Sequence, residues 1–241
     1  MIEAPHKLNT DTYLDFVQYL KTLTDNNDII DKISMITSSG NFLSEYDISK
    51  ENIKVCDLIP IQSEIGLDKI LAKIFNSESL LLNLLHEEGP KILGFPILVY
   101  NNKYIIDGHH RWAQIYIVNP DTEISCININ GISDIEVLLC KLQFNIAMHT
   151  PNNLNGESHT GINIFKCTKS NIKSIIVKFD FALKQAIFNI LNLNGNIDVA
   201  LVDFLYKNIK SINKPIKGSL NREDMPQVFD SPPLTSIMYK I

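Results

Sequence analysis

Residues 96–112 read PILVYNNKYIIDGHHRW. Two apolar, β-branched runs, 96–100 and 103–106, flank the pair Asn101-Asn102, which tolerates the positive φ angles of a tight hairpin turn. Asp-Gly then breaks the second strand, and the apolar spacing over 109–118 predicts a helix that Asn-Pro ends. The stretch therefore predicts a β-hairpin that leads directly into a helix.

Strand and helix patterns alternate on either side of this stretch. The predicted elements are a helix over 10–23, a strand over 53–59, helices over 63–75 and 77–86, a strand over 124–129, a helix over 135–148, a polar loop over 150–160 and a mainly helical region over 171–210. We expect an α/β (α+β) fold with three parts. These are an N-terminal helical extension over 1–52, a central domain over 53–148, and a mainly helical C-terminal region over 149–241 with an irregular tail.

Composition excludes several classes of protein. With 241 residues, 45% of them apolar, the chain can bury a sizeable core, so disorder is not expected. A net charge of −5 lacks the basic excess typical of proteins that coat nucleic acid. No apolar run approaches the roughly 18–20 residues that span a bilayer. Four widely spaced cysteines without a C-x-x-C pair favour a reducing compartment. We therefore expect a cytoplasmic protein with no membrane partner.

Arginine is rare in this chain. Of 22 basic residues, only Arg111 and Arg222 are arginine. Arginine offers a planar fork for phosphate or carboxylate that lysine cannot copy. Each arginine is therefore a candidate ligand of an anion.

The turn after the hairpin concentrates groups that bind phosphate. Gly108 lets the backbone approach a ligand closely, and a helix start offers unpaired N–H groups and the positive end of the macrodipole. Asp107 could hold magnesium or a proton, while His109 and His110 would point about 100° apart on a helix. A purely structural interpretation stays open: Asp107 caps the helix, one histidine lies in the core, and Arg111 pairs with a carboxylate.

The segment Tyr104-Ile-Ile-Asp-Gly-His-His-Arg-Trp-Ala113 resembles the signature of the ParB/sulfiredoxin superfamily, and is especially similar to its free-serine kinase branch and to phage and viral ParB-like proteins. The resemblance covers roughly residues 53–129. It implies a ParB/sulfiredoxin-like fold in which nucleotide phosphates bind at this turn. Residues 57–64 resemble the family's earlier strand-to-helix segment, which carries the catalytic base of the kinase. Here the corresponding position is Gln62, and the nearest acid is Glu64.

The resemblance implies nucleotide-dependent phosphoryl transfer to a small-molecule acceptor, or nucleotide hydrolysis, with ATP, ADP or CTP and Mg²⁺ as cofactors. The expected catalytic residues are Asp107, Glu64 and His110, and Asp107 is also the expected metal ligand. The expected phosphate-binding residues are Gly108, His109, His110, Arg111, Gln62 and Arg222; the late segment around Arg222 distantly resembles one that closes over substrate phosphate in the kinase. Two alternatives remain. One is a ParB-like nuclease or DNA-binding protein that uses the same turn, although the acidic composition does not favour nucleic acid. The other is a non-catalytic nucleotide-sensing module.

Overall fold

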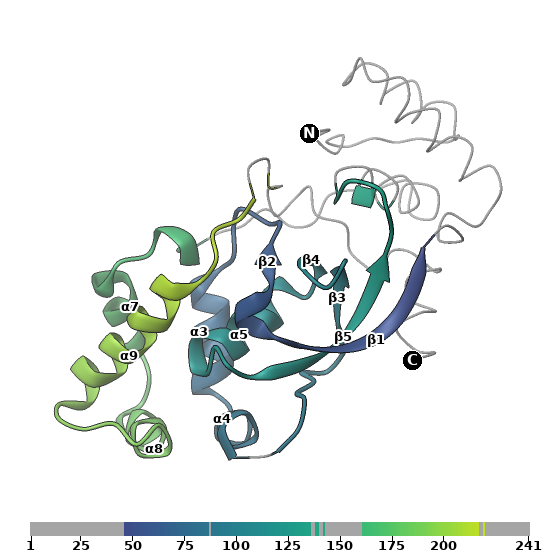
Figure 1. Cartoon of the computed structure of the whole chain (residues 1–241). Helices are drawn as coiled ribbons and strands as arrows, with labels where there is room; N and C mark the ends of the chain where they lie inside the picture. Colours follow the sequence, from purple (N-terminus) through teal and green to yellow (C-terminus); the bar gives the residue numbers. More distant parts are fainter. Residues whose placement is uncertain are drawn as a thin grey trace, which may run out of the picture.

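The computed structural model describes residues 46–86, 88–135, 138, 139, 142, 161–216 and 219. Within these residues the chain forms a mixed α/β fold with one five-stranded sheet, in the order β1-β5-β3-β4-β2 (Figure 1). The predicted helix over 10–23, the loop over 150–160 and Arg222 lie outside the described residues.

The strands are β1 (Asp47–Lys54), β2 (Ile59–Pro60), β3 (Ile97–Tyr100), β4 (Tyr104–Asp107) and β5 (Glu123–Asn130). Strand β5 pairs antiparallel with β1 along eight residues and parallel with β3. Strand β3 pairs antiparallel with β4, and β2 adds a short parallel edge to β4. The sheet is therefore mixed, with β1 and β2 at its edges.

The predicted strand over 53–59 is wrong in its bounds. The strand is β1, which begins at Asp47 and ends at Lys54, before the short helix η1 (Val55–Asp57). Its sequence DISKENIK contains only two isoleucines among polar residues. An edge strand has a neighbouring strand on one side only, and many of its side chains reach solvent. Because β1 is held by backbone hydrogen bonds to β5, which is far along the sequence, its own apolar pattern is weak.

The predicted hairpin is confirmed. Asn101 and Asn102 have φ angles of 51° and 55°, which two-residue hairpin turns require. The N–H of Lys103 donates to the carbonyl of Tyr100 at 3.0 Å. The N–H of Asn102 donates to the side chain of Asn128 in β5 at 2.8 Å, which fixes the turn against the sheet.

The described helices are α3 (Leu67–Phe75), α4 (Glu78–His86), α5 (His109–Val118), α7 (Lys169–Ile176), α8 (Phe181–Ile190) and α9 (Ile197–Ser211), with a short helix η2 at Ile164–Lys166. The predicted bounds of α5 are confirmed, but the helix predicted over 63–75 begins only at Leu67. The preceding loop pairs instead with residues 162–164 through backbone hydrogen bonds. None of the described helices combines the length and the apolarity needed to cross a bilayer.

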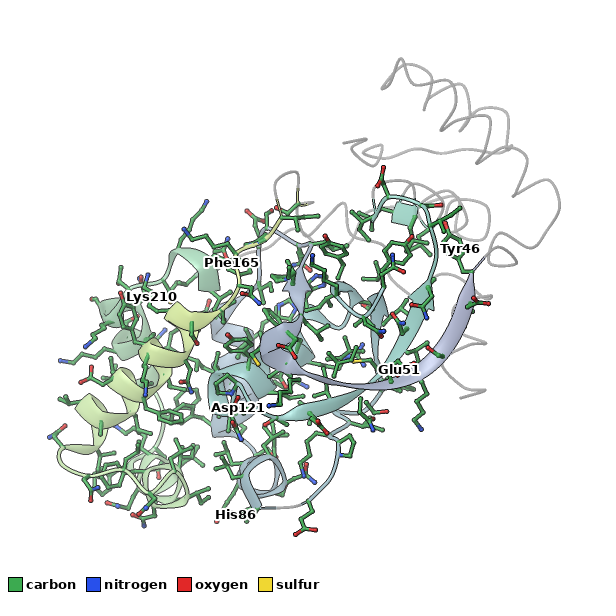
Figure 2. All side chains as sticks on the ribbon, in the orientation of Figure 1. Tyr46, Glu51, His86, Asp121, Phe165 and Lys210 are labelled. Carbon is green, nitrogen blue, oxygen red and sulfur yellow. The ribbon has the colours of Figure 1, made fainter. Side chains whose placement is uncertain are left out.

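The C-terminal helices share a core with the sheet. One cluster of buried residues includes side chains from α3, α4, α5, α7, α8 and α9. The Tyr116 hydroxyl donates to the carbonyl of Ser211 at 2.7 Å, and the Asn208 amide donates to the carbonyl of Ile117 at 2.9 Å. Figure 2 accordingly places Phe165 and Lys210 on the helical side of the molecule, away from Tyr46 at the start of β1. A second buried cluster covers the other face of the sheet.

Burial of Cys126 in β5 predicts an alkaline loss of stability. Burial raises the pKa of its thiol from the usual 9.0 to about 12. The unfolded chain releases this proton first, so the unfolded state binds fewer protons and stability falls as pH rises from about 9 towards about 12. In urea denaturation under reducing conditions, we expect this group to lower the free energy of unfolding by up to about 1.4 kcal/mol per pH unit in that window.

The variant Cys126→Ala should flatten this pH dependence, whatever its effect on stability at neutral pH. The matched control is Cys56→Ala, because Cys56 is only partly buried and its thiol pKa is raised less far. Parallel pH curves for the wild type and Cys126→Ala would contradict the prediction.

Candidate functional site

The turn between β4 and α5 is built around Gly108. This residue is the N-cap of α5 and adopts a left-handed conformation with φ 96°. A Cβ atom there would lie 3.0 Å from Nη2 of Arg111 and 3.1 Å from Cγ1 of Ile97. Both the backbone angle and the close packing therefore require glycine. The N-cap position is therefore Gly108, and not Asp107 as the purely structural interpretation expected.

Arg111 joins this turn to the start of the hairpin. Its Nη2 donates to Oδ2 of Asp107 at 2.9 Å, and its Nη1 donates to the carbonyls of Phe95 and Pro96. The two side chains of the ion pair are 21% and 19% exposed, so the pair is partly shielded from water. The guanidinium carries further N–H donors beyond these three bonds. Pairing of Arg111 with a carboxylate is thus confirmed, and the fork is held in one orientation.

His109 and His110 hold the loop between β2 and α3. Nε2 of His109 accepts the backbone N–H of Ile61 at 3.2 Å, and Nε2 of His110 accepts the N–H of Gly66 at 3.3 Å. A ring nitrogen that accepts a hydrogen bond carries no proton, so in each neutral ring the proton lies on Nδ1. His109 is buried, as the structural interpretation expected for one histidine. Any phosphate contact of these residues therefore has to use Nδ1 or the backbone N–H.

Gln62 and Glu64 lie in the loop that the histidines hold. Gln62 is only 2% exposed, and its side-chain amide donates to the backbone carbonyl of Glu64. The Glu64 side chain is half-buried. The fold thus brings the loop with Gln62 and Glu64 against the start of α5, although about 45 residues of sequence separate them.

Asn163 is a positioning residue that the sequence did not reveal. Its side-chain amide donates to the carbonyl of Ser63 at 2.9 Å, and its backbone forms a bridge with Gly66. Its side-chain oxygen also accepts the N–H of Phe165 and so caps the short helix η2. The loop is thus fixed from two sides, by imidazoles and by residue 163. Only the asparagine's known preference for helix caps could have drawn attention to it.

Within the described ranges, no group of three or more His, Cys, Asp or Glu side chains could hold a metal ion. Magnesium is commonly held by one or two carboxylates together with substrate phosphates, and Asp107 suits a site of that kind. The predicted contribution of Arg222 lies outside the described residues.

Comparisons with known proteins add little to this geometry. No family model and no curated protein matches the sequence. Among solved structures the chain is similar to one titled as the C2221 form of a Pnob8-like ParB-N domain, with 11% identity and a TM-score of 0.28 over 73% of this chain and 67% of that chain. So low a TM-score decides neither the family nor the function. The mixed α/β class rests on the sheet and helices described above.

Proposed function

We propose that the chain binds the phosphate groups of a nucleotide at the turn between β4 and α5 and directs phosphoryl transfer to a small-molecule acceptor or to water. The observation that carries the proposal is the cap of α5. Gly108 has no side chain to occupy the first helical turn, and Arg111 is fixed beside it. N–H groups at a helix start favour phosphate, and the resemblance of residues 104–113 to the ParB/sulfiredoxin signature points to the same ligand.

Arg111 is the specificity residue of this proposal. Its guanidinium is oriented by Asp107 and by two carbonyls before β3, so it loses little freedom when a phosphate oxygen reaches its remaining donors. A lysine has only three N–H donors on one nitrogen. It could not donate to Asp107 and to both carbonyls and still have a donor for the phosphate. We therefore expect affinity to depend on arginine and not merely on a positive charge.

Asp107 would hold Mg²⁺ together with the phosphate oxygens of ATP, ADP or CTP. Bound magnesium supplies charge neutralisation for the leaving phosphate. Without the cation, Asp107 still orients Arg111 through their ion pair. The carboxylate thus links the metal to the guanidinium that faces the same phosphates.

The loop between β2 and α3 positions the acceptor. Glu64 acts as the base, and Gln62 holds the loop closed through its bond to the Glu64 carbonyl. His109 and His110 support the loop through Nε2, which keeps Glu64 near the helix start. Since phosphoryl transfer depends mainly on positioning and charge stabilisation, such support contributes directly to rate.

A calorimetric titration with ATP, ADP and CTP, each with and without Mg²⁺, tests this proposal. We expect at least one nucleotide to bind the wild type, and Arg111→Lys to weaken its affinity about 10- to 100-fold, as expected for loss of a charge-assisted hydrogen bond. Asp107→Asn should abolish the magnesium-dependent part of binding and the turnover. The matched control is Asp198→Asn, which removes the carboxylate of a different ion pair, Lys184–Asp198 at 2.8 Å.

Each outcome separates one function from another. Binding without turnover in the wild type favours a nucleotide-sensing module. Magnesium-dependent nicking of supercoiled plasmid, without nucleotide binding, favours a ParB-like nuclease. Wild-type turnover in Asp107→Asn would show that this carboxylate has no catalytic role, and unchanged affinity in Arg111→Lys would remove the proposed phosphate site.

A further inference from the structure

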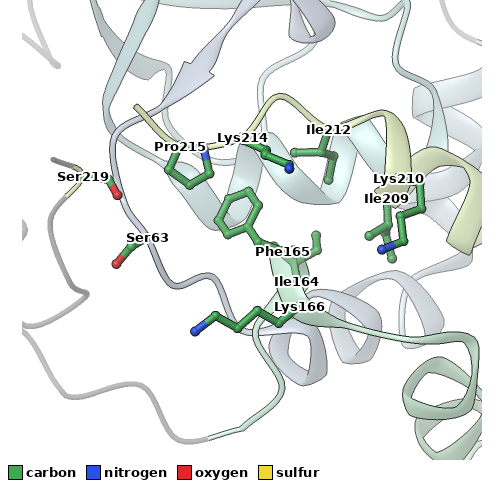
Figure 3. A pocket seen from close by; sticks show the side chains of 10 residues that line it. All are labelled: Ser63, Ile164, Phe165, Lys166, Ile209, Lys210, Ile212, Lys214, Pro215 and Ser219. Atoms are coloured by element: carbon green, nitrogen blue, oxygen red, sulfur yellow. The ribbon is translucent and has the colours of Figure 1, made fainter. Parts of the chain in front are cut away.

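We infer that the chain has a second anion-binding site, between η2 and the end of α9, which takes a small phosphorylated organic molecule. A cavity of about 390 Å³ opens there, large enough for such a ligand. Its lining includes Lys166, Lys210 and Lys214 (Figure 3). This site stands whether or not the turn between β4 and α5 binds a nucleotide.

The charge of the cavity selects an anion. The lining supplied by the described residues contains three lysines and no aspartate or glutamate. Away from the cavity, two aspartates of α9 pair with lysines of neighbouring helices: Asp203 with Lys169 of α7 at 2.6 Å, and Asp198 with Lys184 of α8 at 2.8 Å. The cavity therefore concentrates positive charge on a chain whose net charge is −5. Such a local excess attracts a multiply charged anion more than a singly charged one.

The buried part of the cavity lining is apolar and therefore favours an anion that also carries an apolar group. Ile164, Ile209 and Ile212 are almost completely buried and form part of the main core. Phe165 is half-buried, and Figure 3 shows its ring next to Lys214, with Lys166 extending outward on one side and Lys210 on the other side of the lining, beside Ile209. A ligand with a flat apolar group beside its phosphate would therefore contact the ring while the lysines contact the phosphate.

The site is built from three distant segments of the chain. Lys166 ends η2, Lys210 lies in the last turn of α9, and Ser63 comes from the loop between β2 and α3. Hydrogen bonds join the first and third of these segments: Asn163 donates to the carbonyl of Ser63, and the N–H of Ile164 donates to the carbonyl of Ile65 at 2.9 Å. The end of α9 shares the main core with η2 through Ile209 and Ile164. The cavity is thus preorganised by the fold and not by a single loop.

Phenyl phosphate is the probe for this site. Titrated into the isotopically labelled full chain and followed by NMR, it should shift the backbone amide signals of Phe165, Lys166 and Lys210. Inorganic phosphate should bind more weakly at the same residues, and phenol more weakly still. We expect the triple variant Lys166→Gln, Lys210→Gln, Lys214→Gln to weaken binding about fivefold per lysine, since charges about 4 Å apart in water contribute about that factor.

The matched control replaces three exposed lysines outside the cavity: Lys73→Gln, Lys178→Gln and Lys207→Gln. It changes the net charge equally, so affinity within about twofold of the wild type supports a local site. Equal losses in the two triple variants would mean unspecific attraction and overturn the proposal. Because all three lysines of the cavity are exposed, both triple variants should fold, and thermal unfolding checks this.

Three further results distinguish this site from the proposed function. Phe165→Leu should reduce the preference for phenyl phosphate over inorganic phosphate. In Arg111→Lys, the phenyl phosphate shifts at Phe165, Lys166 and Lys210 should follow the same titration curve as in the wild type, whatever the variant does to nucleotide binding. Shifts confined to the residues around Gly108, or no shift at millimolar phenyl phosphate, would overturn the second site and leave the nucleotide proposal to its own test.

Discussion

Trp112→Ala is expected to lower the free energy of unfolding by about 3–5 kcal/mol. The indole is fully buried in the main core and stacks edge-to-face on Tyr116, with 5.4 Å between ring centroids. Its Nε1 donates to the carbonyl of Val55 at 2.8 Å, which joins α5 to the short helix η1. The substitution opens a cavity and leaves that carbonyl with only the longer bond from the N–H of Leu58, at 3.4 Å. Because the total stability of a domain is typically about 5–15 kcal/mol, this loss is a large share of it.

Urea denaturation followed by circular dichroism measures this effect, since the substitution removes the only tryptophan of the chain. Trp112→Phe separates packing from hydrogen bonding: it keeps an aromatic ring but loses the donor, and should cost about 1–3 kcal/mol. The control is Phe181→Ala, at a side chain that is 64% exposed, with an expected effect within about 0.5 kcal/mol. A loss below about 1 kcal/mol in Trp112→Ala would contradict the packing described here.

Gly108→Ala is expected to destabilise the chain by about 2–5 kcal/mol. Its left-handed backbone would contribute about 1–2 kcal/mol, and the crowded Cβ about 1–3 kcal/mol more. That Cβ would lie 3.0 Å from Arg111 and 3.1 Å from Ile97, so the guanidinium and the isoleucine must shift by a few tenths of an ångström to admit it. Nucleotide affinity should therefore fall together with stability.

Gly195→Ala is a closely matched control for this substitution. Gly195 has φ 95°, against 96° for Gly108, but its Cβ would meet nothing within 4 Å. It should lose only the backbone contribution, about 1–2 kcal/mol, and bind nucleotide as the wild type does. Chemical denaturation and calorimetry on both variants measure the difference. Equal destabilisation in the two variants would mean that the turn around Gly108 is not tightly packed.

Local physics made the hairpin and the helix that follows it predictable. Two asparagines supply the positive φ angles of the turn, and apolar spacing and a following Asn-Pro bound α5. The cluster Asp107-Gly108-His109-His110-Arg111 was likewise visible as a candidate phosphate site, because its residues are adjacent in the chain. Its ion pair joins Asp107 at the end of β4 to Arg111 in the first turn of α5, so it depends on the left-handed turn at Gly108 as well as on the short spacing.

Non-local hydrogen bonds explain what the sequence pattern missed. Strand β1 is polar and is defined by pairing with β5, which lies some 75 residues further on. The loop before α3 looked like a continuation of that helix. Its N–H groups are instead taken by ring nitrogens of His109 and His110, and its carbonyls by residues 163 and 164. These long-range hydrogen bonds outweigh the helix propensity of the loop. Their partners are far away in the sequence, so propensity alone cannot predict them.

The sequence alone determined the chemistry of the turn before α5: a flexible glycine, two imidazoles, one guanidinium and one carboxylate within five residues. Only the tertiary structure decided what these groups contact, directing the imidazoles to a backbone loop and the guanidinium to Asp107. The tertiary structure also brings three lysines to one cavity: one from η2, one from α9 and one from the segment that follows α9. The reason is that residue type fixes which bonds a group can make, whereas its partners depend on long-range packing.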